Sequence, residues 1–164
     1  MIFVTVGTHE QPFNRLVEYM DRWAREHDEP VIIQIGFSTY EPKYCVWSKM
    51  YSYDKIEQIV DEARIVITHG GPSSFIRPLV IGKIPIVVPR KAEFNEHVNN
   101  HQVDFSREME ERQGNIIVVE DIDKLGEVID NYNEIIKNKK NSLINNNERF
   151  CKEFSQIVDS LVGE

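Results

Sequence analysis

Short apolar runs alternate with amphipathic segments along the chain. The apolar runs predict strands at residues 2–6, 31–35, 44–47, 64–68, 84–88 and 115–119. Apolar residues at helical spacing predict helices at residues 12–27, 54–63, from about 73, 96–111, 122–137 and 142–162. Continuously apolar strands that alternate with helices are typical of a parallel sheet covered on both faces. The pattern therefore predicts a single α/β domain of three layers over residues 1–164.

Composition and charge narrow the class of protein. The chain has 164 residues, which is ample for one hydrophobic core and short for two. Its formal net charge of −8 argues against nucleic acid as a partner and against direct adsorption to anionic lipid. No apolar run reaches the roughly 18 residues of a spanning helix, and no signal-peptide pattern opens the chain. Cys45 and Cys151 lie far apart, which fits reduced thiols and a cytoplasmic location.

A polar turn follows the predicted strand at residues 64–68. It reads His69-Gly70-Gly71-Pro72-Ser73-Ser74 and opens a predicted helix. A strand that leads into such a turn presents free backbone N–H groups and the positive end of a helix dipole, which suit a phosphate. The alternative is an ordinary strand–turn–helix link with Pro72 in the first helical turn.

A second polar cluster follows the predicted strand at residues 84–88. It is the row Glu96-His97-Val98-Asn99-Asn100-His101-Gln102. Ligands of open α/β sheets bind outside the carboxyl ends of the strands. The two clusters therefore predict one crevice.

The pairing of these two clusters resembles the donor-binding, C-terminal half of GT-B glycosyltransferases, of the glycosyltransferase family 28 C-terminal-domain type. More closely, it is similar to the catalytic subunit of two-component enzymes. Those enzymes build bacterial exopolysaccharides and capsules, often as galactosyltransferases, or the eukaryotic dolichol-linked chitobiose. The opening residues 1–8 and the pairs Pro12-Phe13 and Arg15-Leu16 fit the same family. The similarity runs from residue 1 to about 120 and implies a Rossmann-like domain.

The resemblance implies transfer of a sugar from a UDP-sugar with inversion at the anomeric carbon. The residues that would hold the donor's diphosphate are Gly70, Gly71, Ser73 and Ser74, with His69 beside them. Those that would contact the donor sugar are Asn100, His101 and Gln102, with Glu96 and His97 lining the same crevice. Tyr51 lies in the turn that would cap the uracil ring, and Gly7 and Thr8 face the side where the acceptor enters.

The general base of inverting members commonly comes from the N-terminal domain, which this chain is too short to include. His9 and Glu10 are the local candidates. The resemblance implies a membrane-associated partner subunit that brings a polyprenyl-diphosphate-linked sugar. The chain would then be cytoplasmic and recruited to the inner face of the membrane only through that partner.

One position departs from the family pattern. Many members carry a glutamate eight residues after the motif histidine, where it binds the ribose hydroxyls, and this chain has Arg77 there. An arginine side chain has no hydrogen-bond acceptor. Another residue must therefore bind the ribose hydroxyls, and Glu93 and Glu96 are the candidates. Arg77 itself either approaches a phosphate or is a solvated helix residue.

Four competing motifs are weaker evidence of function. The glycine fingerprint of dinucleotide-binding folds and the lysine-bearing P-loop are both absent, which disfavours NAD and ATP. His97 and His101 are four residues apart on a predicted helix, a spacing that zinc accepts, but solvent exposure and sugar contact are better accounts. Asp121 and Asp123 precede a predicted helix, where capping explains them better than a metal does. We expect neither a metal nor another cofactor.

Several points stay open at this level. Galactose is the first expectation for the donor sugar, with N-acetylglucosamine and glucose as alternatives. A non-catalytic, nucleotide-sugar-binding regulatory subunit is the alternative function, and an epimerase is disfavoured because such enzymes carry both domains. The apolar face of the predicted helix at 142–162 packs on the sheet, docks a partner, or does both.

Overall fold

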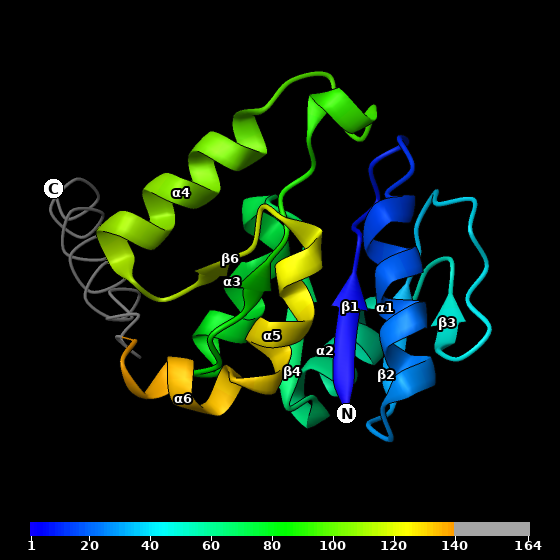
Figure 1. The fold of residues 1–164 in the computed structure, drawn as a ribbon, viewed down its shortest axis with the longest axis horizontal. Coiled ribbons are helices and arrows are strands. Elements are labelled where there is room, and N and C mark those ends of the chain that lie inside the picture. The colour runs from blue at the N-terminus through cyan, green and yellow to red at the C-terminus, as the bar shows by residue number, and fades with distance from the viewer. Residues whose placement is uncertain (140–164) are drawn as a thin grey trace, which may run out of the picture.

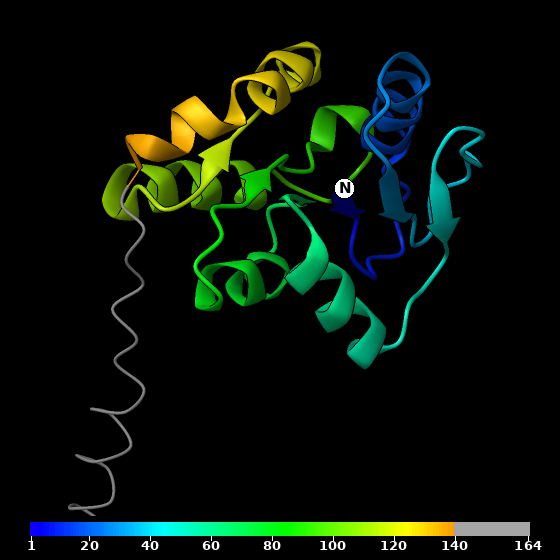
Figure 2. The same cartoon turned by 90° about the horizontal axis from the view of Figure 1, so that it is seen from below.

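Six parallel strands form the centre of the protein (Figure 1). The structure is a computed structural model, and it describes residues 1–139. The helix predicted at 142–162 lies outside the described residues. The strand order is β3-β2-β1-β4-β5-β6, and Figure 2 shows β3 and β6 at opposite edges of the sheet. The strands are β1 (Ile2–Thr5), β2 (Val31–Gln34), β3 (Val46–Ser48), β4 (Ile65–Thr68), β5 (Ile86–Val87) and β6 (Ile117–Val118).

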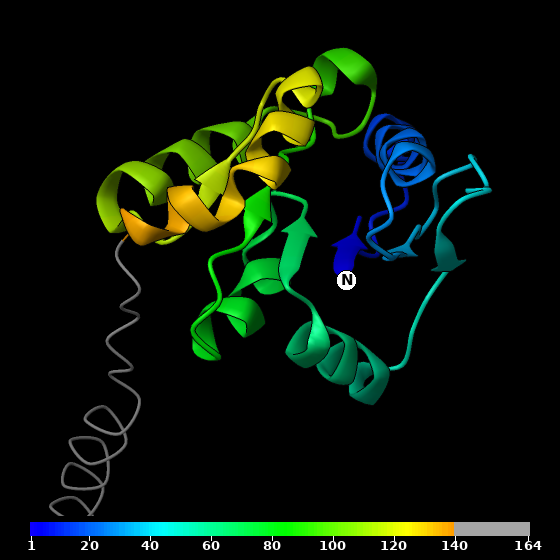
Figure 3. The same ribbon diagram turned by 60° about the horizontal axis from the view of Figure 1, so that its bottom comes forward.

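Helices cover both faces of this sheet, which confirms the predicted α/β domain with its three layers. Figure 3 shows one group of helices on one side of the strands, α1 (Asn14–Glu26), α5 (Leu125–Asp130) and α6 (Tyr132–Lys137). The residues that pack on the other face come from α2 (Tyr53–Glu62), α3 (Pro72–Val80) and α4 (His101–Gln113). Two short 3-10 turns complete the described elements, η1 (Ala92–Phe94) and η2 (Ile122–Lys124).

Alternation along β1 explains how the sheet divides the core. Ile2 and Val4 point into the cluster formed with α1 and α5, whereas Phe3 packs with Val60 of α2 on the opposite face. Successive side chains of a strand point to opposite faces, so a strand buried on both sides must be apolar throughout. All four residues of β1 are buried, as the continuous apolar run predicted.

The strand order reverses direction between β1 and β4. From β1 the chain moves outward through β2 to β3, and it then returns to β4 and continues to β6. The loops that follow β1 and β4 therefore diverge and leave a crevice at the carboxyl edge of the sheet. In Figure 1 the loop after β1 and the segment that contains η1 both lie along the upper edge.

The helix predicted at residues 96–111 begins later than expected. In the structure α4 begins at His101, and residues 95–100 form an irregular turn in which Asn95 is left-handed, with φ of 55°. The side-chain oxygen of Asn99 accepts the N–H of His101, and that of Asn100 accepts the N–H of Ala92. Such local side-chain bonds compete with helical hydrogen bonds. His97 consequently lies in the turn and not on the helix.

The helix predicted at residues 122–137 is divided. It consists of η2, α5 and α6, with a break at Asn131, whose φ and ψ of −92° and 8° are not helical. The side-chain amide of Asn131 donates to the carbonyl of Glu127 at 2.9 Å. Ahead of this segment, the side chain of Asp121 accepts the N–H of Asp123 at 3.2 Å, which confirms the capping interpretation of that aspartate.

Among residues 1–139, no helix combines the length and the apolar composition that crossing a membrane requires.

Candidate active site

A cavity of about 460 Å³ opens where β1 and β4 end. Its walls come from the loop after β1, from Gln34 at the end of β2, and from facing sides of α2 and α3. Seven of the residues predicted for the site line it: Gly7, Thr8, His9, His69, Ser73, Ser74 and Gln102. The first and second polar clusters of the sequence therefore do meet in one crevice.

His69 lies at the centre of this arrangement. A β-carbon on Gly7 would approach its Nε2 to 2.4 Å, and one on Gly71 would approach its Cε1 to 2.3 Å. The ring thus occupies space that only glycine leaves open on two sides. The Nδ1 atom accepts the backbone N–H of Gly71 at 3.0 Å, so the neutral ring carries its proton on Nε2.

The same surroundings keep His69 uncharged. Burial, helped by the positive charge of Arg90, lowers the pKa of His69 to about 4. A neutral His69 at pH 7 presents an N–H donor beside the turn without bringing a full charge.

The turn after β4 uses most of its own donors internally. The N–H of Gly70 bonds Oε1 of Gln102 at 3.0 Å, that of Gly71 bonds His69, and that of Ser74 bonds the Gly71 carbonyl at 3.0 Å. The Ser74 hydroxyl also points back, to the carbonyls of His69 and Gly71. Within residues 1–139 this leaves the N–H and hydroxyl of Ser73, the exposed second residue of α3, without a partner. Of the four residues expected to hold the diphosphate, Ser73 is therefore the one whose backbone and side-chain donors are both still available.

Gln102 has a structural task that the sequence does not reveal. Its Oε1 atom accepts the N–H of Gly70 and, at 3.2 Å, the N–H of Arg90. The side chain is buried, at 4% exposure, and joins the turn after β4 to the segment that follows β5. Its oxygen therefore already serves two backbone groups, and the expected contact of this side chain with the donor sugar stays a prediction that its amide nitrogen would have to meet.

The carboxylate of Glu96 is also engaged in hydrogen bonds within the protein. Its carboxylate forms a two-pronged ion pair with Arg15 of α1, at 2.9 and 2.8 Å, and accepts the N–H of Lys91 at 3.0 Å. It is 2% exposed and does not line the cavity. Glu96 therefore shapes the loop before α4, and its carboxylate is not free to bind ribose.

Arg90 supports the site, although the sequence pattern did not single it out. It is fully buried, and its guanidinium donates to the carbonyls of Val6, Gln11 and Glu96 at 2.8–3.0 Å. It thereby joins the loop after β1 to the loop before α4. Burial lowers the pKa of Arg90 to about 10, which leaves it charged at neutral pH. The sequence feature that could have indicated this role is the position of Arg90, a charged residue directly after the apolar run at 84–89.

Three histidine rings lie next to one another, in tilted and edge-on contact, and His9 is the one that lines the cavity. The ring centroid of His97 lies 4.6 Å from that of His9 and 4.4 Å from that of His101. Burial and the neighbouring His101 lower the pKa of His97. In the part of the chain that the structure describes, no three His, Cys, Asp or Glu side chains are arranged to hold a metal ion.

The remaining predicted site residues lie outside the cavity lining. Glu10 is exposed, and Asn100 holds the N–H of Ala92 with its side-chain oxygen at 2.8 Å. Tyr51 is half-buried against the α2 side of the core, and its backbone N–H donates to Gln34 at 3.1 Å. His101 is exposed at the first residue of α4.

The far wall of the cavity carries charges of both signs. Arg77 of α3 lines it and pairs with Asp61 at 2.9 Å and with Glu57 at 3.5 Å, both on α2. Arg77 is therefore neither simply solvated nor free. Glu57 was not among the predicted site residues, because nothing in the sequence of α2 distinguishes it from the other polar residues of an amphipathic helix.

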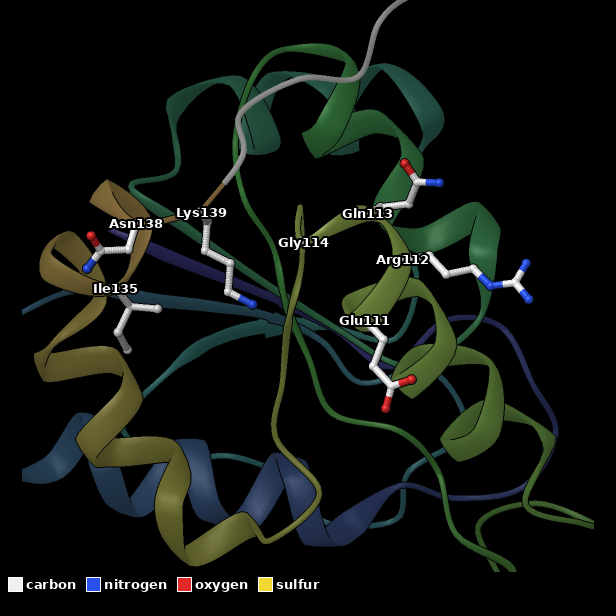
Figure 4. A pocket seen from close by; sticks show the side chains of 7 residues that line it. All are labelled: Glu111, Arg112, Gln113, Gly114, Ile135, Asn138 and Lys139. Carbon is white, nitrogen blue, oxygen red and sulfur yellow. The ribbon is translucent and has the colours of Figure 1, made fainter.

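A second hollow, of about 510 Å³, lies at the opposite edge of the sheet. Figure 4 shows its lining, with Glu111, Arg112, Gln113 and Gly114 on one side and Ile135, Asn138 and Lys139 on the other. It sits beside the end of α4, ahead of β6, and so lies at an amino end of the sheet. Parallel sheets bind ligands at the carboxyl ends of their strands, which favours the first cavity as the site.

Comparison with known proteins supports the fold and gives the family. A solved glycotransferase of kitacinnamycin aligns with 83% of the chain at a TM-score of 0.57 and 16% identity, over 34% of its own length. The glycosyltransferase SnogD from Streptomyces nogalater aligns with 73% of the chain at a TM-score of 0.48 and 16% identity, over 30% of its length. The chain thus spans about a third of these proteins. No curated protein sequence matches it. Residues 1–161 match the sequence model of the glycosyltransferase family 28 C-terminal domain, and the chain belongs to that family.

Proposed function

We propose that this chain is the donor-binding, catalytic subunit of an inverting UDP-sugar glycosyltransferase. Family membership and the cavity at the carboxyl ends of β1 and β4 support the proposal. The observation that carries it is the position of Ser73, at the start of α3 and on the cavity wall, with its N–H and hydroxyl available to an anion. A helix N-terminus stabilises negative charge, which the leaving diphosphate gains during the reaction.

In this reaction an acceptor hydroxyl attacks the anomeric carbon of the donor sugar. The bond from that carbon to the diphosphate oxygen breaks, UDP leaves with the electron pair, and the hydroxyl proton passes to a general base. Ser73 and the neutral, donating Nε2 of His69 would face the diphosphate. The charge is offset by these groups, and the proposal needs neither a metal nor another cofactor.

His9 and Glu10 remain the local candidates for the general base. Nδ1 of His9 accepts the N–H of Gln11 at 3.1 Å, so the neutral ring carries its proton on Nε2. His9 lines the cavity but must give up this hydrogen bond to accept a proton at Nδ1. We therefore expect the base to come from a partner subunit or to require a change in the loop after β1.

The acceptor side completes the proposal. We propose that a second chain supplies the other half of the cleft, as in the two-component enzymes that the sequence resembles. We propose a membrane-associated subunit that binds a polyprenyl-diphosphate-linked sugar and recruits this chain to the cytoplasmic face of the membrane. The pathway would be the synthesis of a surface polysaccharide, such as an exopolysaccharide or capsule, with galactose as the first sugar to test.

Calorimetric titration with UDP, UDP-galactose, UDP-glucose and UDP-N-acetylglucosamine tests the donor site. We expect all four to bind, and Ser73→Ala to weaken UDP about tenfold through loss of a charge-assisted hydrogen bond. Ile76→Ala, an exposed position on the same helix, is the control and should leave UDP affinity unchanged. The absence of binding by any uridine nucleotide, with and without the partner, would contradict the proposal.

A non-catalytic, nucleotide-sugar-binding regulatory subunit is the alternative, favoured by the engaged Nδ1 of His9. Transfer of radiolabelled sugar to a lipid acceptor distinguishes the two. A catalytic subunit should lose transfer when Ser73 is replaced in the reconstituted complex. A regulatory subunit should leave transfer intact when its donor site is destroyed.

A further inference from the structure

The wall of the cavity that α2 and α3 form carries one carboxylate. Among the lining residues, all within the described range 1–139, Glu57 is the only carboxylate and Arg77 the only arginine or lysine. Apolar side chains line the cavity beside the pair, namely Ile56, Val60 and Pro78 of α2 and α3 and Phe3 of β1. A carboxylate among apolar side chains is a specific hydrogen-bond acceptor for a ligand that enters the cavity.

Two neighbours orient Glu57. The hydroxyl of Tyr53 donates to its Oε1 at 3.0 Å, and Nη1 of Arg77 lies 3.5 Å from the same oxygen. Arg77 is itself anchored to Asp61 at 2.9 Å. Both contacts fall on Oε1, and within residues 1–139 the second oxygen of Glu57 has no hydrogen-bond partner. The side chain is 32% exposed, so this oxygen is within reach of a ligand.

The spacing between Ser73 and Arg77 along α3 matches the spacing between the diphosphate and the ribose of a nucleotide. Ser73 and Arg77 are four residues apart, so they share a helix face and are separated by about 6 Å along the axis. A diphosphate at Ser73 would place the ribose, which is joined to it through one methylene group, about one helical turn farther along. That position lies beside Arg77 and its partner Glu57.

We propose that Glu57 accepts hydrogen bonds from the 2′ and 3′ hydroxyls of the donor's ribose, and that Tyr53 and Arg77 hold it in position. The inference rests on the proposed function and names the part of the nucleotide that this wall recognises. Arg77 offers only donors, and vicinal hydroxyls are bound well by a carboxylate that accepts from both. Glu96 is excluded because Arg15 and Lys91 already occupy it, and Glu93 does not line the cavity.

The test compares UDP with 2′-deoxy-UDP by calorimetry on the full chain. The wild-type protein should prefer UDP by about tenfold, the usual value of one hydrogen bond to a charged group. Glu57→Ala removes both hydroxyl contacts from UDP and only the 3′ contact from 2′-deoxy-UDP, so it should weaken UDP about tenfold more than 2′-deoxy-UDP and the preference should disappear. Tyr53→Phe should reduce the preference partially, because it removes only an orienting contact.

Glu62→Ala is the matched control. It removes an exposed carboxylate from the same helix, one that accepts from Gln58 and does not line the cavity. This variant should keep the wild-type preference for UDP. If UDP binds and Glu57→Ala retains the full preference, the ribose assignment is wrong while the proposed function stands. If the wild-type protein binds no nucleotide, the proposed function fails, and the ribose assignment fails with it.

Discussion

Gly7 and His69 lie so close that a β-carbon on the glycine would stand 2.4 Å from Nε2 of the histidine. The loop after β1 and the end of β4 are therefore in direct contact, although 62 residues separate the two positions in the sequence. This contact closes the inner end of the cavity and fixes where the imidazole lies. Any side chain at position 7 must move the ring, the loop, or both.

Gly7→Ala tests this contact. The new methyl group would clash with His69, and alanine would also be strained at φ of 75°. We expect a loss of about 2–4 kcal/mol in the free energy of unfolding, measured by urea denaturation. Gly114→Ala is the matched control, since Gly114 has φ of 64° and a β-carbon at that position would have no neighbour within 4 Å among the described residues. The control should lose only about 1–2 kcal/mol. Equal losses in the two variants would show that the approach to His69 is not tight.

The lowered pKa of His69 predicts a pH dependence of stability. The folded protein holds the ring neutral down to about pH 4, whereas the unfolded chain takes up the proton near pH 6.5. The unfolded state therefore binds more protons between these values, and stability falls as the pH is lowered through this window. Above about pH 6.5 the full stability is present, and the total loss is on the order of 3 kcal/mol.

Urea denaturation from pH 7.5 to 4 measures this effect, with His69→Asn as the reference. Asparagine keeps an acceptor for the Gly71 N–H but does not titrate. Carboxyl groups that lose stability in acid, such as Glu29 beside Arg64, act equally in both proteins and cancel in the difference. Parallel pH profiles for the two proteins would contradict a neutral His69.

Gln102→Ala should destabilise the protein as well as impair the site. The change removes the acceptor of two N–H groups, those of Gly70 and Arg90, and we expect a loss of about 1–3 kcal/mol. UDP binding should weaken too, because the turn after β4 loses the hydrogen bond that holds it to α4. Glu111→Ala, at an exposed position of the same helix, should stay within about 0.5 kcal/mol of wild type. If Gln102→Ala were as stable as wild type and bound UDP normally, the side chain would have no such structural role and could act only on the donor sugar.

Arg90→Lys should cost at least about 3 kcal/mol, despite the retained charge. A single ammonium group cannot reach the carbonyls of Val6, Gln11 and Glu96 together, as the guanidinium does. Arg107→Lys, in which the arginine forms an exposed pair with Glu120, serves as the control and should cost less than about 1 kcal/mol. Similar stabilities for both variants would mean that the hydrogen bonds from the Arg90 guanidinium to the three carbonyls do not stabilise the fold.

The positions of the strands and of the crevice followed from the sequence. Each predicted run became a strand within a few residues. For the inner strands the reason is that a strand buried on both faces has no place for polar side chains, whereas β3 is a partly exposed edge strand. The turn His69–Ser74 and the row Glu96–Gln102 were recognisable because polar residues directly after a buried strand must lie at the sheet edge.

Only the tertiary structure determined which partner each polar side chain at that edge of the sheet binds. Gln102 meets Gly70 across 32 residues, Arg90 meets Val6 across 84, and Glu96 meets Arg15 across 81. A local pattern carries no information about such partners, so the sequence did not predict that Gln102, Arg90 and Glu96 hold loops together. Glu57 reached the cavity in the same way, because α2 and α3 pack side by side on one face of the sheet. Periodicity along the chain determines which residues are buried, whereas the hydrogen-bond partner of a buried polar group depends on which distant segments the fold brings within about 3 Å of it.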